Sequence, residues 1–304
     1  MGANSKIEWC DHTFNPWEGC TKVSPGCLHC YAEARNHRYA AGANWGKGAP
    51  RRRTSAANWA LPVKWNRESG LFVQCSKGHR WQAKSQDQEG YCPECGDPEF
   101  HQVRPRVFCA SLADWLDDEV PLEWLKNLLA LIYDTPELDW LLLTKRPENW
   151  SKRVTMAAAA FRCGIGCMWP LDSGPDNVWV GVSVEDQARA DLRVQKLLEI
   201  PARVRFLSVE PMLGPVNISP FHGSEPGYAP GIDWVICGGE SGLKARPMHR
   251  DWALSLRDGC ESNSVPFFFK QWGEHEWNGV HVGKKNAGRL LAGREWNEFP
   301  EVRP

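Results

Sequence analysis

The sequence lacks the features that mark membrane, secreted or strongly basic proteins. No apolar run reaches the roughly 18 residues that a transmembrane helix needs. The segment from Met1 to Glu8 has no charged region followed by an apolar one, as a secretory signal would. Net charge is also nearly absent, since 36 Lys and Arg oppose 37 Asp and Glu; this excludes a uniformly basic coat for nucleic acid but not a local basic groove. We therefore expect a cytoplasmic globular protein with no membrane partner.

Cysteine, by contrast, is plentiful, with 12 among 304 residues. In a reducing cytoplasm thiols persist as metal ligands or nucleophiles, and stable disulfides are uncommon. Spacing therefore decides which cysteines carry chemistry. Half of them fit no ligand pattern, and we assign these no chemistry because buried free cysteine behaves as a small hydrophobe: Cys10, Cys109, Cys163, Cys167, Cys237 and Cys260.

From Val107 onward, short apolar runs alternate with amphipathic stretches. The runs are rich in β-branched and aromatic residues and predict buried parallel strands at 107–112, 138–144, 178–183, 204–209, 233–237 and 265–269. Crossover helices are expected at 122–133, 147–161, 186–200 and 250–260, and a loop at 211–231. This βα repeat predicts an α/β fold with either a parallel barrel or a doubly wound sheet.

Polar residues follow nearly every predicted strand, and they favour the barrel. A βα-barrel collects its active site at the carboxyl ends of the strands. The alternative is that these residues only mark where burial stops. They are Ser111, Asp114, Thr144, Lys145, Arg146, Ser183, Glu185, Ser208, Glu210, Glu240 and Lys270.

A polar, glycine-rich segment at 67–104 interrupts this pattern and is predicted to be an inserted zinc-ribbon-like module in a barrel formed by 1–66 and 105–304. Cys75, His79, Cys92 and Cys95 supply the four ligands of a closed tetrahedral Zn²⁺ site. A metal bound at such a site would stabilise the fold of a segment that is too short to form a hydrophobic core of its own. A role in recognising nucleic acid or protein, and a purely structural one, both stay open.

A second thiol group lies near the N-terminus, where Cys20, Cys27 and Cys30 share one loop with Pro25 and Gly26. Three thiolates leave one iron of a cubane cluster without a protein ligand, whereas electron-transfer clusters usually take four. S-adenosylmethionine chelates such an iron, and an electron passed to its sulfonium breaks a C–S bond. The loop therefore favours a [4Fe–4S] cluster; a zinc site or unrelated thiols are the alternatives.

Several motifs resemble those of a phage- and prophage-associated family of three-cysteine, radical-SAM-like proteins. The resemblance spans almost the whole chain except the insert. The motifs are Asn15–Glu33, Leu142–Pro147, Gly181–Asp186, Gly238–Gly242 and Phe268–Gly273.

More distantly, the cysteine loop is similar to that of the radical SAM superfamily. This resemblance implies a partial (β/α)6 TIM-like barrel, a [4Fe–4S] cluster, cleavage of S-adenosylmethionine to a 5′-deoxyadenosyl radical, and an electron donor such as flavodoxin or ferredoxin. Here six residues separate Cys20 from Cys27, where three are commonest, and His29 stands where an aromatic residue is common. The His29 imidazole would stack on adenine.

Barrel position in that superfamily implies further roles. Ser111 and Asp114 would face the methionyl amine and Lys145 the methionyl carboxylate. Ser183 and Glu185 would meet the ribose. Four residues are candidates for catalysis, nearer the substrate: Lys145, Glu210, Glu240 and Lys270. Ordinary ion pairs are the alternative for the charged residues.

The segment from Arg35 to Arg53 has six basic residues and no acidic one, with Tyr39 and Trp45 interleaved. Such a segment can neutralise phosphates and stack bases, and we expect Arg51, Arg52 and Arg53 to contact nucleic acid. With the family's phage association this favours modification or repair of a DNA base, flipped out to reach the barrel mouth in the host cytoplasm. A peptide or small-molecule substrate, or a non-enzymatic nucleic-acid-binding protein with two zinc sites, are the alternatives.

Overall fold

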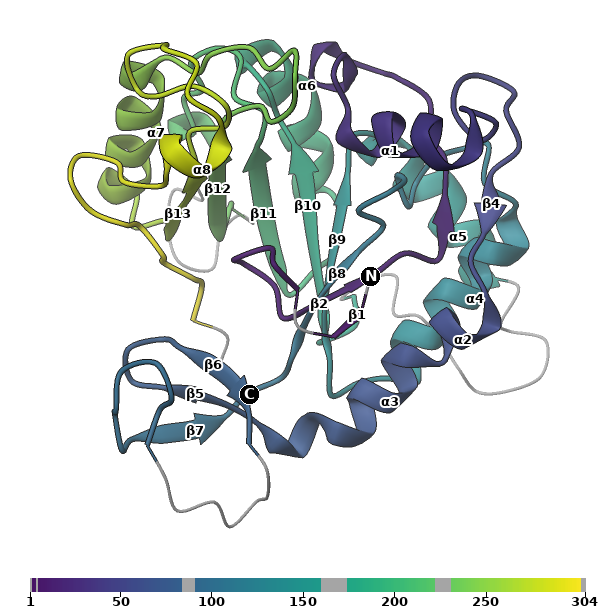
Figure 1. The fold of residues 1–304 in the computed structure, drawn as a ribbon. Helices are drawn as coiled ribbons and strands as arrows, with labels where there is room; N and C mark the ends of the chain where they lie inside the picture. Colours follow the sequence, from purple (N-terminus) through teal and green to yellow (C-terminus); the bar gives the residue numbers. More distant parts are fainter. Residues whose placement is uncertain (1, 4, 84–90, 160–173, 222–230, 302–304) are drawn as a thin grey trace.

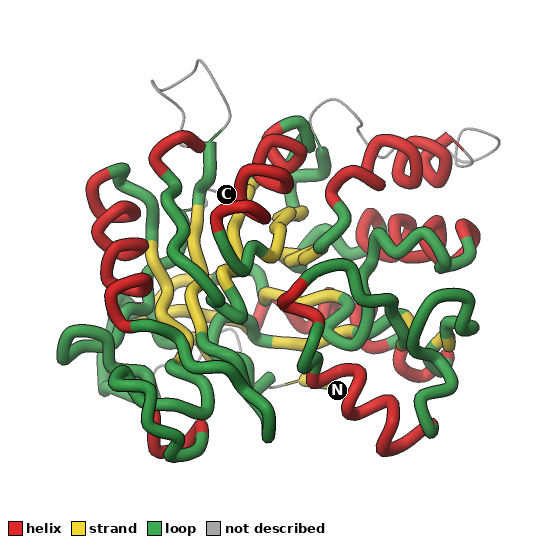
Figure 2. Tube along the Cα trace, turned by 90° about the horizontal axis from the view of Figure 1, so that it is seen from above, coloured by secondary structure: helices red, strands yellow, loops and turns green. Residues whose placement is uncertain are grey.

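The main sheet of the protein is a curled half-barrel (Figures 1 and 2). The computed structural model describes residues 2–3, 5–83, 91–159, 174–221 and 231–301. The strand order is β1-β2-β8-β9-β10-β11-β12-β13; β2 to β13 in this order are parallel, and only β1 is antiparallel to its neighbour. The strands are β1 Gly2–Ala3, β2 His12–Phe14, β8 Arg106–Cys109, β9 Asp139–Thr144, β10 Val178–Ser183, β11 Val204–Val209, β12 Trp234–Gly238 and β13 Phe267–Gln271.

Each of the six strands predicted from Val107 onward is present, within a few residues of its expected ends. The sheet is parallel, as expected, and has a seventh parallel strand, β2, directly before the cysteine loop. Its β13 and β1 edges are not paired with each other, so the half-barrel is open along one side.

Helices α4 Leu122–Tyr133, α5 Trp150–Ala159, α6 Gln187–Leu198 and α7 Arg250–Ser262 cover the convex face of the sheet (Figure 2). In α4 the buried Leu125, Leu128, Leu129 and Ile132 recur at helical spacing, so one stripe of the helix faces the strands. The 147–161 prediction corresponds to η3 Pro147–Asn149 and α5, and its last two residues lie outside the described ones. The shorter elements are β3 Trp17–Glu18, η1 Pro25–Cys27, α1 Tyr31–Ala40, β4 Arg52–Arg53, α2 Ala56–Trp59, α3 Leu61–Glu68, η2 Ser69–Leu71, η5 Ser219–Phe221 and α8 Lys284–Ala287.

Successive side chains of a strand point to opposite faces of the sheet. The apolar side chains therefore form two separate hydrophobic clusters, one on each face. The convex cluster joins Trp140 and Leu142 of β9 to the helices, whereas the concave cluster contains Leu141 of the same strand. The concave cluster also holds Phe108, Trp179, Val204, Phe206, Trp234, Ile236 and Phe268. Residues two positions apart lie on the same face, so the concave face continues toward the carboxyl ends of the strands. There it carries Leu143 and Lys145 after Leu141, then Ser183, then Ser208 and Glu210, and finally Lys270. The concave face is therefore apolar at its base and polar at its upper rim.

The segment Ser5–Cys10 crosses the concave face, where Trp9 and Cys10 are buried in the concave cluster and Ile7 packs against it (Figure 1). The Trp9 ring lies 4.5 Å from that of Phe108 and 6.3 Å from that of Trp234, centroid to centroid. The N-terminal segment thus fills space that further strands would occupy in a closed barrel.

The expected insert contains a separate three-stranded antiparallel sheet in the order β6-β5-β7, below the half-barrel in Figure 1. Its strands are β5 Phe72–Cys75, β6 Arg80–Gln82 and β7 Phe100–Gln102. Arg80 connects the two sheets, because its Nη2 lies 2.9 Å from Asp11 Oδ2 and donates to the carbonyl of Arg104. Among the described residues no helix is long and apolar enough to cross a membrane.

Candidate functional site

A cavity of about 630 Å³ opens at the carboxyl ends of the parallel strands. Its volume lies within the range of roughly 300 to 1,000 Å³ typical of small-molecule sites. Residues at the ends of six strands line it, as the strand-end pattern predicts: Ser111 and Asp114, Lys145 and Arg146, Ser183, Ser208 and Glu210, Glu240, and Lys270.

Cys20, Cys27 and Cys30 all line this cavity. Cys27 ends η1, and Cys30 is the residue before α1. The three thiols do not form a compact ligand group of the kind whose donor atoms all lie within 4.8 Å of one another. A single tetrahedral Zn²⁺, with Zn–S near 2.3 Å, needs sulfurs about 3.8 Å apart.

Glu185 and Arg246 anchor the cysteine loop. Glu185 Oε1 accepts a hydrogen bond from Gly26 N at 3.1 Å, and its other oxygen lies 2.9 Å from Arg193 Nη1. Burial alone would raise the pKa of Glu185, but Arg193, Ser24 and Gly26 together hold that pKa below its usual value. A Cβ at position 26 would lie 3.1 Å from the Glu185 carboxyl carbon, so glycine permits this close approach. Glu185 does not line the cavity, and its expected contact with ribose stays a prediction.

The second anchor is Arg246, whose Nη2 donates to the Pro25 carbonyl at 3.1 Å. Its guanidinium also holds Glu240, whose Oε2 lies 3.2 Å from His29 Nδ1. Burial would raise the pKa of Glu240, but the hydrogen bonds from Arg246 and His29 lower it overall. His29 is thus tied to the end of β12.

Arg146 contacts the first cysteine directly, with Nη1 at 3.4 Å from Cys20 Sγ. Burial raises the pKa of Cys20 to about 12, despite the opposing effect of Arg146, and burial also raises the pKa of Cys30. Both thiols therefore need a cation to become thiolates.

Asp114 and Lys145 differ in how many polar contacts their side chains already make within the protein. Asp114 accepts from Thr144 Oγ1 at 2.7 Å and from Lys145 N at 2.8 Å, and pairs with Arg146 at 3.1 Å. This buried carboxylate fixes the turn after β9, in place of the free partner expected for an amine. Lys145 Nζ, by contrast, donates to Ser183 Oγ at 3.1 Å, and both residues line the cavity.

On the other side of the cavity, Lys270 Nζ lies 2.7 Å from Glu210 Oε1. These two catalytic candidates therefore form an ion pair at the ends of β11 and β13. Tyr31 was not predicted, although it directly follows Cys30. It lines the cavity, and its hydroxyl donates to the Ser111 carbonyl.

The expected nucleic-acid contacts of the arginine run are corrected in part. The Arg51 side chain is fully buried and pairs with Asp117 at 2.8 Å, so it stabilises the loop and is not available to a phosphate. Arg52 pairs with Glu18, and Arg53 stacks over Trp59 with its Cζ 4.4 Å from the ring centroid. Arg52 and Arg53 remain exposed.

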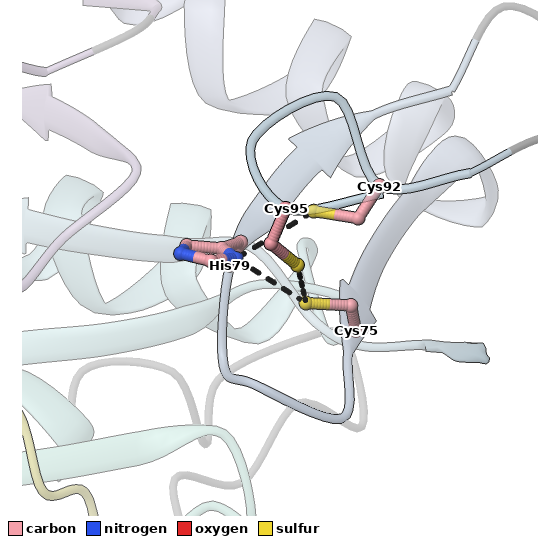
Figure 3. A group of neighbouring side chains, drawn as sticks. All are labelled: Cys75, His79, Cys92 and Cys95. Carbon is pink, nitrogen blue, oxygen red and sulfur yellow. Dashed lines mark hydrogen bonds between the residues drawn. The ribbon is translucent and has the colours of Figure 1, made fainter. Parts of the chain in front are cut away.

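The insert holds a compact metal-ligand group of Cys75, His79, Cys92 and Cys95, whose donor atoms all lie within 4.8 Å of one another (Figure 3). Cys75 Sγ lies 3.5 Å from His79 Nδ1 and 3.9 Å from Cys95 Sγ, and Cys92 Sγ lies 3.6 Å from His79 Nδ1. These are the edge lengths of a small tetrahedron. The group can bind a metal ion such as zinc.

The six cysteines without a ligand pattern fall into two sets. Cys163 and Cys167 lie outside the described residues. Burial raises the pKa of each of the others, Cys10, Cys109, Cys237 and Cys260, as expected for small core side chains.

One protein family matches the chain, with the description "Protein of unknown function (DUF5131)", over residues 4–300. No curated protein and no solved structure matches it.

Proposed function

The chain belongs to the DUF5131 family, and we propose that it is a radical S-adenosylmethionine enzyme that modifies or repairs a base in nucleic acid, DNA above all. One observation carries this proposal. The three thiols of one loop line a single cavity at the carboxyl ends of a parallel half-barrel, together with polar residues from six strand ends.

The donor set fits a [4Fe–4S] cluster held by Cys20, Cys27 and Cys30. The three thiols line one cavity, and the loop that carries them is anchored at Pro25 and Gly26. When bound, the cluster would supply an electron that cleaves S-adenosylmethionine to methionine and a 5′-deoxyadenosyl radical. A flavodoxin or ferredoxin would provide that electron.

Several cavity residues have atoms free to bind this cofactor. Among the described residues no carboxylate lies within ion-pair distance of the Lys145 ammonium, which would pair with the methionyl carboxylate. The Ser111 hydroxyl already contacts Asn15 and the Ser183 hydroxyl accepts from Lys145, so both would offer their remaining lone pairs as acceptors beside it. Arg146 would remain on Cys20 and balance thiolate charge.

The Glu210–Lys270 pair lies in the same cavity and is partly accessible, with 20% and 15% of the two side chains exposed. A carboxylate and an ammonium in contact can exchange a proton with a substrate heteroatom. We therefore assign this pair to the substrate side. The tetrahedral group of the insert would hold Zn²⁺ and stabilise the small sheet.

Metal analysis of two matched cysteine variants tests the proposal. Anaerobically reconstituted Cys27→Ala should lose the iron and the broad visible absorption of the cluster but keep zinc. Cys95→Ala should lose zinc and keep iron. Full iron content and 5′-deoxyadenosine production in Cys27→Ala would contradict the proposal.

The substrate is tested by incubating the native protein anaerobically with reductant and S-adenosylmethionine, with and without oligonucleotides. Mass analysis should reveal an altered nucleoside only in the complete mixture. An altered peptide or small molecule in place of a nucleoside would favour the alternative substrates.

A further inference from the structure

The acidic and the basic residues that line the cavity differ in how many of them have an oppositely charged partner. Its three acidic residues are all satisfied within the chain: Asp114 by Arg146, Glu210 by Lys270, and Glu240 by Arg246. Two of its basic residues also have carboxylate partners, since Lys22 pairs with Glu33 at 2.7 Å and Arg35 with Glu18 at 3.1 Å.

Three lysines remain. Lys6, Lys145 and Lys284 line the cavity, and within the described part of the chain none of their ammonium groups lies within ion-pair distance of a carboxylate. An excess of uncompensated positive charge in a concave site attracts an anionic ligand.

The proposed cofactors do not remove this excess. An oxidised cubane held by three thiolates carries one net negative charge and S-adenosylmethionine one net positive charge, so the two cancel. The methionyl carboxylate would occupy Lys145. Lys6 and Lys284 are then left for another anion.

These two lysines belong to opposite edges of the open sheet. Lys6 follows β1, and Lys284 begins α8, which follows β13. In Figure 1 the Ser5–Cys10 segment crosses in front of the central strands, and α8 lies beside the upper end of β12. Lys6 and Lys284 are both exposed. Both lysines therefore line the cavity from segments that are not part of the parallel strands.

We propose that Lys6 and Lys284 form a phosphate-binding site in the cavity, which holds the phosphate of the nucleotide whose base enters the cavity. This inference rests on the proposed function and refines it, because it replaces the buried Arg51 with two residues inside the site. The phosphate belongs either to a nucleic-acid backbone or to a free nucleotide.

The test measures binding by the native protein as purified, over a salt series, with a fluorescent single-stranded DNA oligonucleotide. The same sequence with an uncharged methylphosphonate backbone shows how much of the binding needs phosphate. Thymidine 5′-monophosphate, used as competitor, distinguishes a free nucleotide from a backbone. The variants are Lys6→Gln/Lys284→Gln and the control Lys285→Gln, which removes an exposed neighbouring charge that does not line the cavity.

We expect the slope of log affinity against log salt to fall by about 1.4 in the double variant, roughly 0.7 for each lost phosphate contact to a single strand. Lys285→Gln should keep the native slope, and the uncharged oligonucleotide should bind the native protein and the double variant equally. Competition by the monophosphate at low concentration assigns the site to a nucleotide, and its absence assigns it to a backbone. Equal slopes for the double variant and Lys285→Gln, or no binding of either charged probe, would overturn the inference. Iron content and 5′-deoxyadenosine production without substrate are recorded in parallel, so a failure of the radical chemistry is seen separately from a failure of phosphate binding.

Discussion

At the scale of single residues, Glu185 connects the cysteine loop to the body of the half-barrel. Glu185→Ala removes the acceptor of Gly26 N and leaves the buried Arg193 without its carboxylate. Loss of one partner of a buried pair costs about 3 kcal/mol. We expect faster hydrogen exchange at 21–27 and easier loss of iron to a chelator, even in protein that is not turning over.

The matched control is Glu199→Ala, which removes an exposed carboxylate paired with Lys196 after the end of α6. It should change neither exchange in the loop nor iron retention. Equal behaviour of the two variants would mean that Glu185 does not hold the loop.

Asp139 gives a prediction of pH dependence. Burial raises its pKa to about 6, against the partial opposition of Arg106 and Arg104. Because the folded pKa lies above the unfolded one, near 3.8, ionisation of Asp139 disfavours the fold. This cost is absent below the unfolded pKa and rises to at most about 3 kcal/mol above pH 6. Asp139→Asn should therefore raise thermal stability at pH 8 and have a smaller effect at pH 5, as measured by calorimetry. An effect that does not change between these pH values would show that Asp139 is not titrating in this range.

At the scale of elements, the small sheet and its metal group should depend on each other. Its strands have only three or four residues each, too few for a core of their own. Cys92→Ala/Cys95→Ala should unfold the sheet locally and free Arg80 from Asp11. We expect protease cleavage within 72–102 in this variant, with iron retained. Lys77→Ala, which changes an exposed side chain in the turn between Cys75 and His79, should remain resistant. Resistance of the double cysteine variant would show that the sheet does not need the metal.

The sequence predicted the strands better than it predicted the roles of individual side chains. Six parallel strands were found because each is an apolar run bounded by polar residues. The seventh, β2, has only the three residues His12–Phe14 and leaves no such pattern. The zinc-type ligands were found because their spacing is local. The roles of Arg51 and Glu185 were not, because their partners Asp117 and Arg193 come from other parts of the chain and only folding brings them together.

At the scale of the whole molecule, the C-terminal segment covers the base of the half-barrel. The Phe299 ring lies 5.1 Å from that of Trp234 and 5.3 Å from that of Phe268, and the Arg106 guanidinium lies 3.9 Å from its centroid. Phe299→Ala should lower the free energy of unfolding by about 2 kcal/mol, less than the ~3 to 5 kcal/mol of a fully buried Phe. Leu243→Ala, at a fully exposed residue, should have no effect in the same denaturant titration. Equal stability of the two variants would show that the segment does not contribute to the core.

The Ser5–Cys10 segment also determines when the fold can be completed during synthesis. Trp9 leaves the ribosome well before Phe268 of its concave cluster, which is made 259 residues later (268 minus 9). At about 5 to 20 residues per second this delay is roughly 13 to 50 s. Throughout that time the thiols of the nascent chain remain outside a finished cavity. Metal loading of Cys20, Cys27 and Cys30 would therefore follow translation, and cells starved of iron should accumulate a full-length protein that is still competent to receive its cluster.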